Sequence, residues 1–388
     1  MERAMNKTQI FEERLDNFKK ATNREHPAYV PVMAHPAPGV IDYAGTTLRD
    51  VIEDETQCVN ALLKVFDDLY CDVTISYGYA YLPHAKDTFG KAQNVLGPDG
   101  ITIEHLQESL MEDSEYPELI RNPDAFVSDV LLKRKYPEIF TENMDSVKEK
   151  MKMVLLDFFN AYISVPDQLT RRLETYYGVP TINDGALMTF NPLDIIFDSF
   201  RGFTGTVKDL RRHKKEVHEA IDVLWNTRCS HHDQVGDYPY ACQWPHIPAY
   251  MNRKQFEEFY WPYEKQLIEN LAKNGNKLYM LAEGKWVQLL DYFREVPKDS
   301  VIIHCDDDDV IEVSKKIGDY QIVAGGANLA RTKIADKQSN IDHAKRVIDE
   351  CAGTGAFIFC IDKNWTCAGD VNQTLLDVYQ FAHEYGRY

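Results

Sequence analysis

Short apolar runs alternate with longer amphipathic stretches along most of the chain. The short runs are rich in β-branched and aromatic residues and are too short for typical globular helices, which predicts strands. These predicted strands are Tyr29–Met33, Val73–Tyr77, Lys277–Leu281, Val301–His304, Tyr320–Ala324 and Ala356–Ile361. The longer stretches predict helices over Thr47–Leu69, Ser146–Tyr177, Val207–Asn226, Arg253–Lys273, Val310–Ile317, Lys333–Cys351 and Asp370–Tyr385.

The alternation is most regular in the last third of the chain, where each predicted strand is followed by a helix. Strands separated by helices indicate crossover connections and hence a parallel sheet. No GxGxxG sequence follows the first strand, which disfavours a dinucleotide-binding fold. We therefore predict an α/β fold, a (β/α)8 TIM barrel in a single domain over residues 1–388. Residues 1–27 would form a helical N-terminal extension, and residues 87–166 a helical insertion near the barrel mouth.

Composition excludes several classes of partner. The net charge of −18 repels phosphate backbones and anionic lipid, so neither nucleic acid nor a membrane surface is expected as a partner. No stretch approaches the roughly 18 apolar residues of a membrane helix, and the first twenty residues lack the apolar run of a signal peptide. The eight cysteines form no CxxC pair and are expected to be reduced thiols. Together these features predict a cytoplasmic protein.

Candidate chemistry follows from the barrel geometry, because active residues of a (β/α)8 barrel lie at the carboxyl ends of its strands. Titratable and polar side chains occur at most of the predicted strand ends. They are His35, Tyr77, His246, Glu283, His304 with Cys305, Asn328, and Cys360 with Asp362.

A metal site is one interpretation of these residues. Glu283 and His304 end two successive predicted strands, so their side chains can converge on one ion. Cys360 and Asp362 end the last strand at the same mouth, and oxygen, nitrogen and sulfur ligands together suit Zn²⁺. The alternative is that Glu283 and His304 only hydrogen-bond to loops.

Two polar clusters have a simpler explanation than catalysis. Asp306–Asp309 precedes a predicted helix, where aspartate caps the first turn and faces the helix dipole, so only Asp306 is expected to reach the site. His231, His232 and Asp233 lie in a polar loop and are expected to be solvated rather than metal-bound. P-loop, HExxH and GxSxG sequences are absent.

Several sequence elements in order resemble one enzyme family. They are Tyr29–Met33, Phe200–Gly205 followed by Asp209–Arg212, Met251–Pro262, and Gly275–Gly284 ending in Leu-Ala-Glu-Gly. This series resembles the uroporphyrinogen decarboxylase superfamily over roughly residues 28–388. The decarboxylase branch is disfavoured because the segment Met33–Gly39 holds no arginine to grip substrate carboxylates.

The corrinoid-dependent methyltransferase branch is a closer resemblance. Its coenzyme-thiol members carry HxC where this chain has Leu281 and Glu283. The O-demethylase component resembles a Glu-x14-Glu-x20-His zinc pattern, which Glu283 and His304 match while Ile268 replaces the first glutamate. No DxHxxG sequence is present, so the corrinoid would be supplied by a separate corrinoid protein.

The resemblance implies a zinc-dependent methyltransferase that moves a methyl group from a small-molecule donor, an aryl methyl ether, to a Co(I) corrinoid. Alternatives are a decarboxylase-like or coenzyme-thiol methyltransferase relative, or a non-catalytic barrel, and a homodimer is compatible with the sequence. The roles follow from strand-end position. Catalysis is assigned to Glu283, His304, His35 and Tyr77, substrate binding to His246, Asp306 and Asn328, and zinc binding to Glu283, His304, Cys360 and Asp362.

Overall fold

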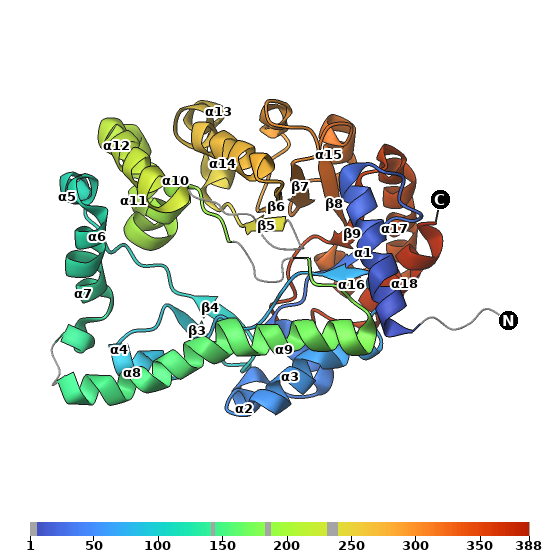
Figure 1. Ribbon diagram of the computed structural model, residues 1–388, viewed down its shortest axis with the longest axis horizontal. Helices are drawn as coiled ribbons and strands as arrows, with labels where there is room; N and C mark the ends of the chain where they lie inside the picture. The colour runs from blue at the N-terminus through green and yellow to red at the C-terminus, as the bar shows by residue number, and fades with distance from the viewer. Residues whose placement is uncertain (1–5, 141–143, 183–187, 231–239, 388) are drawn as a thin grey trace.

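A curved parallel sheet forms the centre of the computed structural model, which describes residues 6–140, 144–182, 188–230 and 240–387 (Figure 1). All pairings between its seven strands are parallel. The strands, in spatial order, are β2 (Val73–Thr74), β1 (Val32–Ala34), β9 (Phe357–Ile361), β8 (Ile322–Ala327), β7 (Val301–Cys305), β6 (Lys277–Ala282) and β5 (Tyr240–Gln243). The architecture is TIM-barrel-like, with helices outside a curled parallel sheet.

One further segment touches both edges of this sheet. Thr181 forms a parallel bridge with Thr74 of β2, and Met188 forms one with Cys242 of β5. The amide of Ile182 donates to the Thr74 carbonyl, and the amide of Thr189 donates to the Cys242 carbonyl. The described ends of this segment therefore occupy the place between the two edge strands, although each makes only an isolated bridge.

Helices cover the outer face of the sheet. The principal ones are α1 (Lys7–Asn23), α3 (Glu55–Leu63), α11 (Gly202–Arg212), α12 (Lys214–Leu224), α14 (Trp261–Lys273), α15 (Val310–Ile317), α17 (Lys337–Cys351) and α18 (Gln373–Tyr385). Shorter helical turns join them: η1 (Pro38–Ala44), α2 (Leu48–Val51), η2 (Lys64–Asp67), α10 (Pro192–Ile195), η8 (Ile196–Arg201), η9 (Trp225–Cys229), η10 (Ile247–Tyr250), α13 (Arg253–Gln255), η11 (Phe256–Tyr260), η12 (Leu290–Arg294), α16 (Leu329–Ile334) and η13 (Ala352–Thr354).

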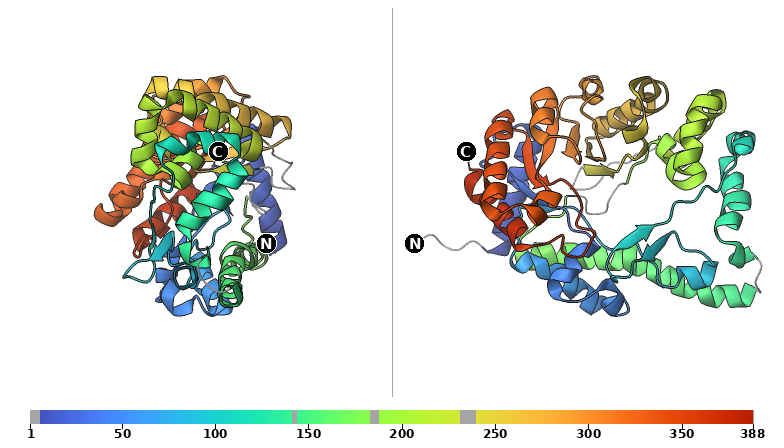
Figure 2. Two further views of the ribbon diagram at one scale, coloured as in Figure 1. Left: turned by 90° about the vertical axis from the view of Figure 1, so that its left-hand side faces the viewer. Right: turned by 180° about the vertical axis from the view of Figure 1, so that it is seen from behind.

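Residues 80–177 lead away from the sheet and return along a long helix whose last part, residues 165–177, packs against α3 and α1 (Figure 2). They comprise α4 (Ala85–Phe89), the antiparallel pair β3 (Asn94–Leu96) and β4 (Ile103–His105), η3 (Asp113–Glu115), α5 (Tyr116–Arg121), α6 (Pro123–Phe126), η4 (Val127–Leu131), α7 (Leu132–Lys135), η5 (Pro137–Phe140), α8 (Met144–Phe159), η6 (Asn160–Ser164), α9 (Val165–Arg172) and η7 (Leu173–Tyr177). The last four form one long, nearly continuous helix along the lower edge of Figure 1, with π-helical turns at η6 and η7.

Side chains inside the curl of the sheet form their own buried cluster. Alternate residues of a strand face opposite sides, so Tyr279, Ile302, Ile322 and Ile358 point inward while their neighbours pack against the helices. Phe18 of α1 joins this inner cluster and contacts the ring of Tyr240 edge-on at 5.5 Å. Helix α1 therefore covers one end of the interior.

The segment that leads into β1 meets the C-terminal end of the described chain at that same end. Tyr29 and Arg387 form an antiparallel bridge, and the amide of Val30 donates to the carbonyl of Gly386 at 2.8 Å. Because Tyr29 immediately precedes β1, this junction lies at the amino-terminal ends of the strands.

The predicted strands of the last third agree with β6 to β9 to within three residues at each boundary. Strand β5 and the β3–β4 pair were missed, because each has only three or four residues and no clear alternation. The predicted helix Thr47–Leu69 is broken into α2, α3 and η2, since Asp54 caps a new helix. None of the described helices combines the length and apolar content that a membrane crossing requires.

A buried polar cluster joins α14 to β5. Glu264 is fully buried, and its Oε2 atom accepts hydrogen bonds from the side-chain amides of Asn191 and Gln243, both at 3.1 Å. Its Oε1 atom has no hydrogen-bond partner among the residues that the structure describes. Burial away from water raises the pKa of Glu264 to about 7.

The raised pKa makes a prediction about stability. A carboxyl group with a raised folded-state pKa contributes stability below its unfolded pKa of 4.5, and this contribution is lost as the pH rises through about 7. We expect Glu264→Gln to gain on the order of 3 kcal/mol relative to wild type between pH 4.5 and 8. Urea unfolding at several pH values measures this difference. The exposed Glu269→Gln on the same helix is the control, and a difference independent of pH would contradict the assignment.

Candidate active site

A cavity of about 1040 Å³ opens at the carboxyl ends of β6 and β7. We call it the mouth cavity. The residues that line it are His105, Gln107, Phe197, Asp198, Phe203, His246, Ala249, Tyr250, Glu283, Gly284, Lys285, Asp306 and Asp307. Its lining residues come mainly from the loops after β5, β6 and β7, from β4 and from η8. Segments far apart in the sequence therefore line one cavity.

His246 is the most strongly positioned titratable group in this cavity. Its Nδ1 atom lies 2.9 Å from both carboxylate oxygens of Asp198, and its Nε2 atom lies 3.7 Å from Oε2 of Glu283. The hydrogen bond with Asp198 raises the pKa of His246 to about 9. The ring is therefore an imidazolium at neutral pH.

Asp194 fixes the backbone beneath His246. Its Oδ1 atom accepts hydrogen bonds from the amides of His246 and Ile247, at 3.1 and 3.0 Å, and its Oδ2 atom accepts one from the Tyr260 hydroxyl. Burial raises the pKa of Asp194 to about 6. Asp194 and Asp198 lie one turn apart on α10 and η8, so one helical turn holds both the backbone and the ring of His246.

Glu283 and Asp306 form the floor of the cavity. The Asp306 carboxylate accepts a hydrogen bond from the Gly284 amide at 2.8 Å and pairs with Lys363. Gly284 has φ +76°, and a Cβ atom there would lie 2.7 Å from the Cβ of Ala249, so only glycine fits this turn. Burial raises the pKa of Glu283.

Aromatic rings form the opposite side. Phe203 contacts Tyr250 edge-on at 4.8 Å, and Phe197 stacks with Tyr250 at 6.3 Å. Tyr250 is 60% exposed and Phe203 40%, so their faces are available to a ligand. The mouth cavity thus combines an apolar aromatic wall with an acid–base group.

A second set of donors lies below the floor. His304 is two residues before Asp306 on the same face of β7, which places it about 7 Å deeper. His35, His304 and Cys360 are all buried, and their donor atoms lie within 4.8 Å of one another. Among the described residues, no comparable group contains Glu283. The structure thus brings His304 together with Cys360 and His35, and places Glu283 beside His246.

Hydrogen bonds fix the proton positions of this inner set. His304 Nε2 lies 2.6 Å from the carbonyl oxygen of Ile361, which can only accept, so Nε2 carries the proton. Burial lowers the pKa of His304 to about 4, so the ring is neutral and Nδ1 is an acceptor. The Tyr279 hydroxyl, 2.6 Å away, donates to it and accepts from His35 Nε2 at 2.8 Å.

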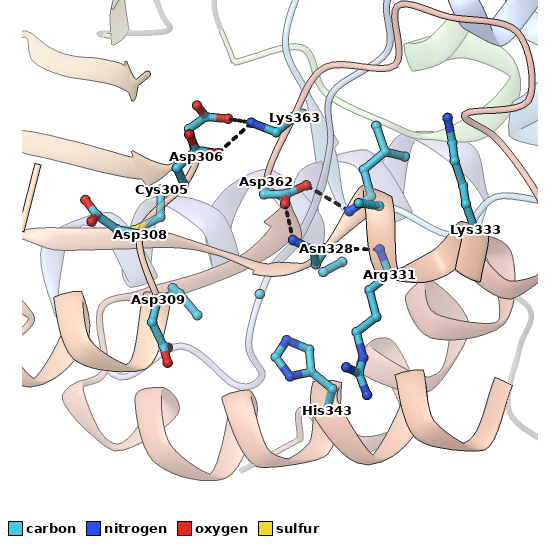
Figure 3. A pocket seen from close by; sticks show the side chains of 16 residues that line it. Cys305, Asp306, Asp308, Asp309, Asn328, Arg331, Lys333, His343, Asp362 and Lys363 are labelled. Atoms are coloured by element: carbon cyan, nitrogen blue, oxygen red, sulfur yellow. Dashed lines mark hydrogen bonds and ion pairs between the residues drawn. The ribbon is translucent and has the colours of Figure 1, made fainter. Parts of the chain in front are cut away.

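The remaining predicted site residues lie elsewhere. Asn328 donates to Asp362 at 2.6 Å, and both line a side cavity of about 680 Å³ beyond β7 and β8, together with Arg331 and His343 (Figure 3). Asp306 and Asp307 line both this side cavity and the mouth cavity, and Lys363, which pairs with both of them, lines the side cavity. Asp362 has its pKa raised to about 6 by burial.

Tyr77 points away from both cavities. Its hydroxyl donates to the carbonyl of Leu62 in α3 at 2.9 Å, and its ring packs against Phe66. His231, His232 and Asp233 lie outside the described residues. The Arg201–Asp209 pair, part of the family-like sequence, is a buried salt bridge at 2.6 Å beside Tyr116 rather than a cavity residue.

Comparison with family models identifies the part of the chain that carries β5 to β9. Residues 195–361 match the uroporphyrinogen decarboxylase (URO-D) family. No curated protein matches the chain. The URO-D match includes His246, Glu283 and His304, and so covers both the mouth cavity floor and part of the inner donor set.

Sequence reasoning missed Asp198, Tyr279 and the aromatic wall. Asp198 lies 48 residues before His246 in a π-helical turn, and nothing in the sequence pairs them. Tyr279 follows the apolar alternation of β6 and resembles a core residue. The one sequence signal for Asp198 is its position, two residues before the family-like segment Phe200–Gly205.

The His246–Asp198 pair predicts a specific titration. A histidine with a raised pKa contributes stability below its unfolded pKa near 6.5, and this contribution is lost as the pH rises through about 9. Asp198→Asn should lower the pKa of His246 by at least one pH unit, because the largest cause of the shift is removed. NMR titration of the His246 ring measures both values. An unchanged pKa in Asp198→Asn would exclude the pair.

Proposed function

We propose that the chain is a methyltransferase that moves a methyl group from a neutral aryl methyl ether to the Co(I) corrinoid of a separate protein, with Zn²⁺ bound. The observation that carries the proposal is the mouth cavity, in which the aromatic wall faces a protonated His246 held by Asp198. The URO-D match supports an enzyme of a superfamily that includes methyltransferases.

The inner donor set fits zinc better than the Glu283–His304 pair. Two imidazoles and one thiol within 4.8 Å are the borderline-soft ligands that zinc takes, with a fourth position left open. His304 already donates its Nε2 proton to the Ile361 carbonyl, which is the usual outer contact of a metal-bound histidine. Zinc would therefore take Nδ1 and replace the hydrogen bond that Nδ1 now accepts from the Tyr279 hydroxyl. We therefore assign zinc to His35, His304 and Cys360. When bound there, zinc would supply a Lewis acid beneath the floor of the mouth cavity, one strand level below the oxygen that His246 faces.

Glu283 and Asp362 then have other roles. Glu283 faces Nε2 of His246 and orients the proton donor. Asp362 holds the N-terminus of α16, where it accepts from the amide of Leu329 at 2.9 Å, and it binds Asn328.

His246 supplies the proton that the leaving oxygen needs. Transfer of the methyl group to the corrinoid of the partner protein would leave the electron pair of the broken carbon–oxygen bond on oxygen, as a phenolate. The Nε2–H of His246 projects toward Glu283 at the cavity floor and would protonate that oxygen. Asp198 stabilises the imidazolium before transfer and orients the neutral ring afterwards.

Charge in the cavity favours a neutral substrate. Four carboxylates line the cavity, namely Asp198, Glu283, Asp306 and Asp307. The positively charged lining residues are His246 and Lys285, and Lys363 pairs with Asp307 at the boundary. Because these carboxylates outnumber the cations, the acidic surface would repel an anionic aryl ether. None of the described residues that line the mouth cavity is an arginine, which also disfavours a polycarboxylate decarboxylase substrate.

The zinc assignment is tested by metal content. Wild-type protein purified without chelator should hold about one zinc per chain. Cys360→Ser should lose most of it because a thiolate ligand is removed, whereas Glu283→Gln should retain it. Elemental analysis measures this, with circular dichroism as the folding control. Loss in Glu283→Gln together with retention in Cys360→Ser would restore Glu283 as a ligand, and wild-type protein without zinc would remove the metal from the proposal.

Proton delivery is tested by leaving-group dependence. His246→Gln should slow methyl transfer by roughly a hundredfold or more, because general acid catalysis contributes about 10²–10⁴. The loss should shrink for ethers whose phenol products are more acidic, since these oxygens need less protonation. The appearance of methyl-Co(III) measures the rate with a series of methoxyphenols.

Two controls separate chemistry from binding. His105→Gln changes the other histidine of the mouth cavity, whose pKa is lowered by burial, and should have little effect. A methoxybenzoate should be a poorer substrate than the neutral methoxyphenol of the same size. Equal loss across all leaving groups would reduce His246 to a binding role, and no transfer by wild-type protein would reject the proposal.

A further inference from the structure

The long helix formed by α8, η6, α9 and η7, which we call the arm, exposes an apolar surface that nothing in the described chain covers. Its buried side packs through Val154, Ala161 and Val165. The other large apolar side chains between residues 153 and 163 are 42–59% exposed. They are Met153, Leu155, Leu156, Phe158, Phe159, Tyr162 and Ile163, which we call the arm stripe.

The arm stripe is uncharged over its whole length. The one charged residue within it, Asp157, is turned inward and lies 3.0 Å from the ring of His84. A helix that is apolar on all sides is ordinarily buried on all sides. Exposed apolar patches of more than a few hundred Å² mark interaction sites.

We propose that the arm stripe is a dimer interface that binds the same stripe of a second copy, with the two long helices antiparallel. A self-complementary surface around a two-fold axis is the commonest way in which identical chains associate. The inference does not depend on the chemistry proposed above.

Charge at the two ends of the stripe supports this pairing. Glu149 and Lys152, which form an ion pair within the chain, precede the stripe, and Asp167 and Arg171, a second such pair, follow it. With a two-fold axis beside Phe159, Lys152 of one copy lies opposite Asp167 of the other, and Glu149 lies near Arg171. Each end therefore meets opposite charges, whereas a parallel pairing would set like charges together.

The area is sufficient for a stable contact. An aromatic or similar large side chain has about 150–250 Å² of surface, so seven at about half exposure offer on the order of 600 Å² per chain. Two copies would bury at most about 1,200 Å², which is the lower end of the range for stable protein interfaces. The chain's net charge of −18 makes an anionic lipid surface a poor alternative occupant.

The interface would also brace part of the candidate active site. Val154 packs with Ala85 and Phe89 of α4 on the inner side of the arm, and the β3–β4 pair follows directly. His105, at the end of β4, lines the mouth cavity. Covering the outer side of the arm would therefore hold this wall of the cavity in place.

The test is the mass of the full chain in solution by sedimentation or light scattering. Wild type at tens of micromolar should be a dimer, and Phe159→Glu should weaken the dimer by roughly a hundredfold or more, because two charges would be buried in an apolar contact. Ile334→Glu, at an isolated residue that is 87% exposed, is the matched control and should remain dimeric. Lys152→Glu should weaken the dimer, and adding Asp167→Lys should restore it.

Three outcomes would overturn the proposal. They are a wild-type monomer at every concentration, a dimer that Phe159→Glu leaves intact, and a wild-type monomer whose arm stripe instead binds an added corrinoid protein. Circular dichroism of each variant confirms that the chain remains folded.

Discussion

The two-residue period of the parallel strands is the constraint on which the candidate site depends. Because every second side chain of β6, β7 and β9 faces inward, functional groups are stacked in levels rather than spread over one surface. Glu283 and Asp306 belong to the upper level at the mouth, and His304 belongs to the level below. In the register of β6 and β7, His304 is paired with Leu281 and not with Glu283. His304 therefore lies near His35 and Cys360, which come from the far side of the curl.

The two levels differ in dielectric environment, and this separates their chemistry. The upper level is open to solvent, so Asp198 can keep His246 charged. The lower level is dry, so both histidines are neutral and the cysteine is held as a thiol by burial. Neutral imidazoles suit a metal, whereas a charged imidazolium suits proton transfer. The fold thus places the charged imidazolium of His246 and the neutral imidazoles of the inner set on adjacent levels, and each keeps its own protonation state.

Much of the parallel sheet could be predicted from the sequence, because β6 to β9 are largely apolar runs that are buried except at Lys277. The residues at strand ends could also be predicted, because the end of each apolar run marks the end of a strand. What could not be predicted was the register, since a strand pattern shows which residues alternate but not the level at which neighbours align. Glu283 and His304 were therefore expected to meet. Asp198 of the Asp198–His246 pair lies in a π-helical turn, and a sequence shows no such turn.

The junction of Tyr29 with Arg387 has a practical consequence. It lies at the end of the curl that Phe18 covers, whereas His246 and Glu283 lie at the other end. A tether attached through the C-terminal residues would therefore anchor the protein by its closed base. Surface-immobilised molecules would all present the mouth cavity outward, oriented alike toward whatever diffuses in from solution.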